Sequence, residues 1–104
     1  MTQLQILPPA QLQAKIDEGA YVLDIRDLNS YNENHIKGSQ RIDNSNIAAF
    51  LADADKDKPV VVCCYKGFSS MQAAEVFINQ GFDQVYSLEG GFNTVSLAYP
   101  QLCA

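Results

Sequence analysis

Residues 59–80 (PVVVCCYKGFSSMQAAEVFINQ) contain the side chains whose types and spacing suit covalent chemistry. Pro59 is followed by three valines and Cys63, a continuous apolar run that is typical of a strand buried on both faces of a parallel sheet. Cys64 then begins a short polar turn, and a helical pattern follows that turn. In α/β proteins, anions and reacting groups lie at such a junction between a strand end and a helix N-terminus.

The predicted surroundings of Cys64 favour a thiolate. Successive backbone N–H groups of a tight loop can converge on one anion, and the dipole of the following helix adds partial positive charge. Lys66 adds a full positive charge two positions later. Each of these lowers the pKa of a thiol and leaves the sulfur nucleophilic near neutral pH. Cys63 is predicted instead to be a buried structural cysteine of the strand.

The helix after this turn is predicted from its apolar spacing. Ser69 or Ser70 is the expected N-cap, and Gly81 marks the expected end. The buried stripe is expected to consist of Ala73, Ala74, Phe77 and Ile78.

The stretch VCCYKGFSS resembles the active-site loop of the rhodanese family, in particular of its single-domain thiosulfate sulfurtransferases. In that loop a glycine follows the catalytic cysteine by three positions, as Gly67 follows Cys64. Many members carry a basic residue two positions after the cysteine, matched by Lys66, and serine or threonine five positions after it, matched by Ser69. Other members have arginine at that fifth position.

Two further motifs resemble those of the family and occur in the same order. Residues 21–38 resemble its first signature at Asp24, Arg26, Tyr31, His35, Ile36 and Gly38. Residues 88–92 (LEGGF) resemble its closing signature, although a tryptophan that is frequent three positions after Phe92 is replaced by Val95. The resemblance therefore covers nearly the whole chain.

The resemblance implies a thiosulfate sulfurtransferase with Cys64 as the catalytic nucleophile and a persulfide intermediate. The implied substrate-binding residues are Tyr65, Lys66, Gly67, Phe68, Ser69 and Ser70. No metal and no organic cofactor is implied. The implied sulfur donor is thiosulfate, and the acceptor is cyanide or a thiol. A thioredoxin-like dithiol, glutathione and a dedicated protein partner all remain open as cellular acceptors.

Two other functions remain as alternatives. A rhodanese-like cysteine phosphatase needs arginine six positions after its cysteine to clamp a phosphate through two hydrogen bonds, and that position is Ser70 here. A sulfur-carrier or regulatory module with a protein donor or acceptor is the other alternative. Inactive relatives generally lack the cysteine, whereas Cys64 is present.

Polar residues outside the loop are expected to be architectural. Asp24 and Arg26 follow a predicted strand and are expected to form a hydrogen-bonded pair that fixes the next loop. His35 is the only histidine, and its titration range suits a general base. If the loop already keeps the cysteine ionised, no general base is needed, so we expect His35 to be structural. A lone histidine is also a poor metal ligand set.

The rest of the chain predicts alternating strands and helices. Strands are expected at residues 4–6, at a sheet edge, and at 21–25, 39–42 and 84–88. Helices are expected after Pro8 and Pro9, around Tyr31, after a cap at Asn44 or Ser45, and from Phe92 to Pro100. The predicted class is α/β, a rhodanese-like three-layer fold with a central parallel sheet and helices on both faces. Cys103 is expected at the surface.

Composition predicts a soluble acidic protein. With 104 residues, of which 47% are hydrophobic, the chain is expected to form one domain over residues 1–104. A net charge of −5 argues against nucleic acid and anionic membranes as partners. We see no leader-like or membrane-spanning stretch, and three cysteines do not predict a disulfide framework. A cytoplasmic location is expected, with a monomer or a weak homodimer both compatible.

Overall fold

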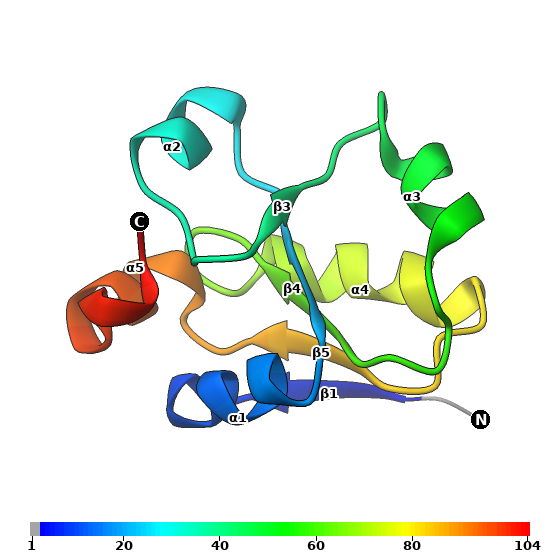
Figure 1. Ribbon diagram of the computed structural model, residues 1–104, viewed down its shortest axis with the longest axis horizontal. Coiled ribbons are helices and arrows are strands. Elements are labelled where there is room, and N and C mark those ends of the chain that lie inside the picture. The colour runs from blue at the N-terminus through cyan, green and yellow to red at the C-terminus, as the bar shows by residue number, and fades with distance from the viewer. Residues whose placement is uncertain (1–2) are drawn as a thin grey trace.

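Five parallel strands form one sheet in the order β1-β5-β4-β2-β3, which places β4 at the centre (Figure 1). The computed structural model describes residues 3–104. The strands are β1 (Leu4–Leu7), β2 (Tyr21–Asp24), β3 (Gln40–Arg41), β4 (Val60–Cys63) and β5 (Val85–Leu88). The predicted α/β class with a parallel sheet is confirmed, and β1 lies at a sheet edge as expected.

Helices cover both faces of this sheet. They are α1 (Leu12–Asp17), α2 (Leu28–Glu33), α3 (Ile47–Asp53), α4 (Ser69–Asn79) and α5 (Gly91–Ala98), with short 3-10 turns at Pro9–Gln11 and Pro100–Leu102. Residues of α1 and α5 pack into one apolar cluster, and residues of α3 and α4 pack into the other. No helix in the described part of the chain is long and apolar enough to cross a membrane.

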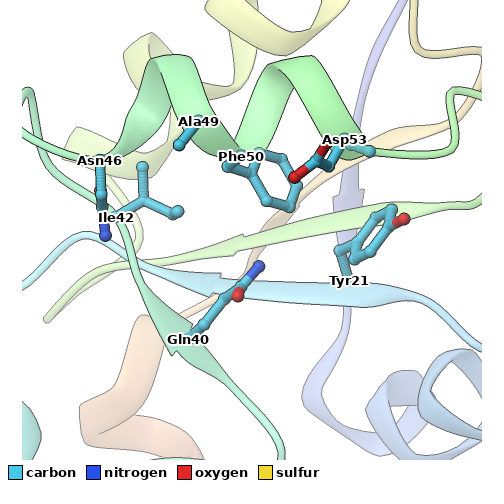
Figure 2. A pocket seen from close by; sticks show the side chains of 8 residues that line it. Tyr21, Gln40, Ile42, Asn46, Ala49, Phe50 and Asp53 are labelled. Atoms are coloured by element: carbon cyan, nitrogen blue, oxygen red, sulfur yellow. The ribbon is translucent and has the colours of Figure 1, made fainter.

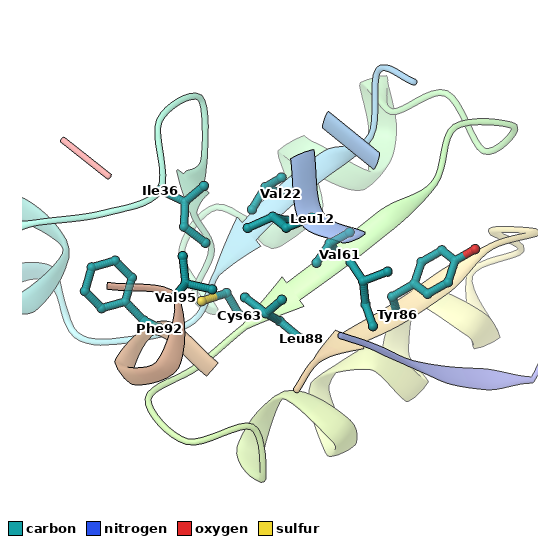
Figure 3. Packing of buried hydrophobic residues seen from close by; sticks show 10 residues of the cluster. Leu12, Val22, Ile36, Val61, Cys63, Tyr86, Leu88, Phe92 and Val95 are labelled. Carbon is teal, nitrogen blue, oxygen red and sulfur yellow. The ribbon is translucent and has the colours of Figure 1, made fainter. Parts of the chain in front are cut away.

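The central strand β4 contributes to both apolar clusters. Val61 and Cys63 pack on the face of α1 and α5 (Figure 3), while Val60 and Val62 pack on the face of α3 and α4. All four side chains are fully buried. This double burial is the physical reason for an apolar run without alternation, because a strand covered on both faces has no side that needs polar residues.

Parallel pairing brings the carboxyl ends of the strands to one edge of the sheet. Asp24 of β2 lies beside Cys63 of β4, and Ser87 of β5 lies beside Val62. The loops that follow β2, β4 and β5 therefore start close together. This edge is where an open α/β sheet offers a binding crevice.

Two predicted helix caps are wrong. The N-cap of α4 is Phe68 rather than Ser69 or Ser70, because the helix already begins at Ser69. The N-cap of α3 is Asn46 rather than Asn44 or Ser45. In that turn the Asp43 carboxylate accepts hydrogen bonds from the backbone N–H and the hydroxyl of Ser45, so the serine stabilises the turn before the helix.

The expectation of a surface position for Cys103 is also wrong. Its side chain is half-buried and packs against the cluster that contains Cys63. The backbone of Cys103 pairs with Ile36 in an antiparallel bridge. The tail returns to the body of the protein because the backbones of His35 and Ala104 exchange two hydrogen bonds.

Candidate active site

Cys64 lies between the end of β4 and the start of α4, at the carboxyl edge of the sheet. Residues 64–68 form the connecting loop, and we call residues 64–70 the cysteine loop. Gly67 has a φ of +95°, a left-handed conformation that a residue with a Cβ rarely adopts. A Cβ at this position would also come within 3.0 Å of the Gly90 nitrogen. Glycine at this place is therefore required both by the turn and by the close approach of a second loop.

The sulfur of Cys64 is the focus of the cysteine loop. The backbone N–H of Gly67 donates to Sγ over 3.1 Å, and the backbone N–H of Ser70 donates to it over 3.3 Å. In the thiol form the S–H donates to the Ser70 hydroxyl over 3.3 Å. Only 4% of the residue is exposed. A sulfur held in this way is surrounded by donors that favour its anionic form.

The pKa of the Cys64 thiol reflects two opposing effects. Burial raises it, but hydrogen bonds from the Ser70 side chain and from the backbone N–H groups of Ser70, Gly67 and Lys66 together lower the pKa below its ordinary value. The predicted contribution of backbone donors is therefore present. Lys66 contributes here through its backbone N–H group.

The N-terminus of α5 holds the cysteine loop from outside. The backbone N–H of Phe92 donates to the Cys64 carbonyl over 2.7 Å, and that of Asn93 donates to the Tyr65 carbonyl over 3.0 Å. These two hydrogen bonds fix the orientation of the first peptide units of the cysteine loop. The contact requires a glycine at Gly91, where a Cβ would come within 2.5 Å of the Cys64 carbonyl oxygen.

Tyr65 connects the cysteine loop to α2. Its hydroxyl donates to the Asp27 carboxylate and lies 2.8 Å from the Ser30 hydroxyl. The hydrogen bond from Tyr65, assisted by two from Ser30, lowers the pKa of Asp27 to about 2. Asp27 also caps α2 by accepting the backbone N–H of Ser30. The contact between Tyr65 and Asp27 had no local sequence signal, because 38 positions separate the two residues.

The remaining side chains of the cysteine loop lie around a hollow of about 350 Å³. It is lined by Cys64, Tyr65, Lys66, Phe68, Ser69 and Asn93. Lys66 is exposed at this opening, and Phe68 exposes 70% of its surface. Ser70, in contrast, is fully buried beneath the sulfur. The structure thus brings five of the seven predicted site residues together around one opening, places Gly67 and Ser70 against the sulfur instead, and adds Asn93, which the sequence did not indicate.

The other predicted polar residues form the frame of the site. Arg26 binds Asp24 through two parallel hydrogen bonds, one of them 2.8 Å long, in a pair that is almost completely buried. This confirms the expected architectural pair. Its guanidinium group also lies 3.9 Å from the centre of the Phe92 ring, at the start of α5. The pair therefore supports the same helix end that holds the cysteine loop.

His35 contacts residues away from the cysteine loop. Its ring stacks on Tyr31 with 4.1 Å between ring centres, and its Nδ1 lies 2.8 Å from the Tyr31 carbonyl oxygen. These contacts fit the structural role expected from the sequence. Among the described residues, no three His, Cys, Asp or Glu side chains gather closely enough to hold a metal ion.

A larger hollow, of about 420 Å³, lies between α3 and the edge of the sheet at β3 (Figure 2). Tyr21, Gln40, Ile42 and Phe50 are among the residues that line it. None of its lining residues belongs to the cysteine loop. Its lining contains no cysteine, histidine or cation, so it lacks a nucleophile and a group that would attract an anion.

Comparison with known proteins gives a consistent result. Residues 8–98 match the family model described as a rhodanese-like domain. A thiosulfate sulfurtransferase GlpE from Pseudomonas syringae is 46% identical over 101 residues, which cover 97% of this chain and 95% of that protein. A protein of the same name from Pseudomonas aeruginosa is 50% identical over 96 residues, which cover 92% of this chain and 87% of that protein.

A solved structure has the same fold at lower sequence identity. The reduced CoADR-RHD protein of Bacillus anthracis superimposes with a TM-score of 0.83 at 23% identity. The match covers 97% of this chain but only 18% of that longer chain. At this level of identity the likeness concerns the fold alone.

Proposed function

This chain belongs to the rhodanese family, and from that premise we propose that it is a thiosulfate sulfurtransferase in which Cys64 carries the sulfur. Its relatives of similar length are thiosulfate sulfurtransferases by name, and this assigns the chain to the sulfurtransferase class of enzymes. The single observation that supports Cys64 as the nucleophile is the convergence of the Gly67 and Ser70 N–H groups on its sulfur.

The first half-reaction loads the sulfur. The Cys64 thiolate attacks the outer sulfur of thiosulfate and forms a new S–S bond. The bond between the outer and the central sulfur breaks, and sulfite leaves with its electron pair. The product is a persulfide on Cys64, with the negative charge on its terminal sulfur.

The second half-reaction unloads the sulfur. Cyanide attacks the terminal sulfur, thiocyanate leaves, and the Cys64 thiolate is restored with the electron pair of the broken S–S bond. A cellular thiolate can take the place of cyanide and become a persulfide itself. Two displacements through one covalent intermediate give ping-pong kinetics.

The proposed anion cradle is the cysteine loop. The backbone N–H groups of Gly67 and Ser70 and the Ser70 hydroxyl stabilise the negative sulfur, because each can donate to it. Lys66, exposed beside the hollow, attracts the sulfonate oxygens of thiosulfate. Tyr65, Phe68 and Ser69 shape the opening through which the substrate enters.

The proposed cellular location follows from the chemistry of a reactive thiol. A reducing compartment such as the cytoplasm keeps a low-pKa thiol from forming disulfides. The acceptor is proposed to be cyanide in the assay and a thiol in the cell, with a thioredoxin-like dithiol as one candidate. The proposed unit is one domain over residues 1–104, as a monomer or a weak homodimer.

Phosphatase activity is the less suitable alternative. The side chain six positions after Cys64 is Ser70, which is fully buried and hydrogen-bonded to Ser87. It offers no guanidinium group, so a phosphate dianion would lack a planar cationic partner.

Intact-mass measurement tests the proposal directly. Thiosulfate should add the mass of one sulfur atom to the parent protein, and cyanide should then remove it and release thiocyanate. Cys103→Ser is the matched control because Cys103 is a thiol outside the cysteine loop, and this variant should still take up sulfur. Phosphate release from an aryl phosphate without sulfur uptake would instead support the phosphatase.

A further inference from the structure

A serine on the neighbouring strand lies behind the site. Ser87 belongs to β5, exposes 1% of its surface, and has its Oγ 2.7 Å from Oγ of Ser70. Ser70 in turn lies 3.3 Å from the Cys64 sulfur. Three side-chain atoms therefore form a chain from the β5 strand to the nucleophile. A fully buried hydroxyl such as that of Ser87 is unfavourable unless it is hydrogen-bonded.

The direction of these hydrogen bonds depends on the charge of the sulfur. In the thiol form the S–H donates to the Ser70 oxygen, which leaves the Ser70 hydroxyl proton free to be donated to Ser87. A thiolate can only accept, so the Ser70 hydroxyl must turn its single proton toward the sulfur. The oxygen of Ser70 then needs a donor, and within residues 3–104 the Ser87 hydroxyl is the side chain placed to supply it.

On the basis of the proposed sulfur transfer, we propose that Ser87 is a positioning residue for this reaction. Its hydroxyl donates to Ser70 and so orients the Ser70 hydroxyl toward the anionic sulfur of Cys64. Hydrogen bonds in a chain strengthen one another, because each donor that also accepts becomes more polarised. Ser87 thus acts on the sulfur only through Ser70 and does not touch the substrate.

The pH dependence of Cys64 alkylation by iodoacetamide measures this effect, with peptide mapping to read Cys64 alone. Ser70→Ala should raise the alkylation midpoint by about one pH unit, since it removes a direct donor to a charged group. Ser87→Ala should raise it by about half a unit, since it removes only the second bond of the chain. The Ser70→Ala/Ser87→Ala double variant should have the same midpoint as Ser70→Ala.

Ser39→Ala is the matched control. Ser39 is also a buried serine, but its Oγ has no hydrogen-bond partner in the structure of residues 3–104. Its removal should leave the midpoint unchanged. Ser87→Thr, which keeps a hydroxyl group, should return the midpoint to the parent value.

The neighbouring charged and titratable groups are the same in all these variants. They are Lys66 and Tyr65 in the loop, Cys63 in β4, and the buried pair formed by Asp24 at the end of β2 and Arg26 just after it. A difference between variants therefore reports the hydroxyl chain.

Additive shifts in the double variant, or an unchanged midpoint in Ser87→Ala, would overturn the role of Ser87. Alkylation needs no sulfur transfer, so these outcomes are separate from failure of the proposed function. That failure would appear as a parent protein that takes up no sulfur from thiosulfate. If both proposals hold, sulfur uptake by Ser87→Ala should be about threefold slower below the midpoint and equal to the parent well above it.

Discussion

Two cysteines that are neighbours in the chain lie in opposite surroundings. Cys63 ends the central strand, with its sulfur among Val95, Leu88 and other buried apolar side chains (Figure 3). Burial, and next the negative charge of Asp24, raise the pKa of the Cys63 thiol far above its ordinary value. The Cys64 sulfur receives two backbone N–H groups, and hydrogen bonds lower the pKa of its thiol despite burial.

The difference shows that burial alone does not decide how a thiol behaves. Both residues expose less than a tenth of their surface, Cys63 none of it and Cys64 only 4%. The two thiols differ because hydrogen-bond donors point at the sulfur of Cys64. Such donors are available only where the chain leaves the strand and turns. One residue along the chain is enough, because Cys63 is the last residue of β4 and Cys64 is the first residue of the loop that follows.

The strongest test of this comparison removes each sulfur in turn. Cys64→Ser should abolish sulfur uptake, because a serine hydroxyl is not ionised near neutral pH and forms no persulfide. Cys63→Ala should keep most of the activity and lose about 1 kcal/mol of the free energy of unfolding, through a small cavity in the apolar cluster. Thiocyanate formation and denaturant unfolding measure the two effects. An inactive but folded Cys63→Ala variant beside an active Cys64→Ser variant would reverse the assignment.

A second test displaces the cysteine loop without changing either sulfur. In Gly91→Ala a Cβ would meet the carbonyl of Cys64 and the backbone of Tyr65, at 2.5 and 2.6 Å. The loop must move, and a displacement of about 1 Å at a reacting group can reduce the rate by about 100-fold. We expect a loss of kcat of that order and a rise in the alkylation midpoint of Cys64.

Gly81→Ala is the control for this test. Gly81 has a φ of +95°, and a Cβ there would meet nothing within 4 Å. Both variants should lose about 1–2 kcal/mol of stability from the left-handed conformation, but Gly81→Ala should keep its kcat. Equal loss of kcat in both would show that backbone strain, rather than contact with the cysteine loop, causes the effect.

The sequence was informative where a feature is local. The valine run, the polar turn after Cys64 and the apolar spacing of the following helix depend on neighbouring residues, and each has a physical signature over a few positions. The predicted N-cap of α4 was wrong because serine is a residue type that commonly caps helices, which made Ser70 a candidate. In the folded protein its hydroxyl is used instead by Cys64 and Ser87.

Features made by tertiary contacts could not be predicted in the same way. The hydrogen bonds from the start of α5 to the cysteine loop join residues 28 positions apart, at Phe92 and Cys64. The glycine pair at 90–91 was recognised as a motif, but its reason is a steric one that only the packed loops reveal. Ser87 looked like one residue of an ordinary last strand, because nothing in its neighbours points to a sulfur.

A third test removes Lys66, the cation of the cysteine loop near Cys64. Lys66→Ala should raise KM for thiosulfate about 5- to 30-fold, the effect of losing a charge-assisted hydrogen bond worth about 1–2 kcal/mol at an exposed site. The contact is made to bound substrate as well as to the transition state, so kcat should change less. Steady-state kinetics at two salt concentrations measure both effects.

Lys58→Ala is the matched control, since it changes the net charge equally but lies before β4, at the opposite end of that strand. Its KM should stay at the parent value. If both lysine variants raise KM equally, the general field of a protein with a net charge of −5 governs thiosulfate binding rather than a local contact.

The test with the smallest expected effect compares the two thiols through the pH dependence of the free energy of unfolding. The folded pKa of Cys64 is lowered, so between that pKa and the unfolded value of about 8.5 the unfolded state binds more protons and stability rises with pH. The folded pKa of Cys63 is raised, so its contribution is complete below about 8.5. Above that value stability falls by about 1.4 kcal/mol per pH unit, because only the unfolded thiol ionises.

Denaturant unfolding between about pH 6 and pH 10 should show Cys64→Ser without the rise and Cys63→Ala with a shallower fall. Cys103, whose pKa is also raised by burial, contributes equally to all three proteins and cancels in the comparison. If Cys63→Ala kept the full alkaline fall, the Cys63 thiol would have to ionise in the folded protein, and the contrast between the two sulfurs would be lost.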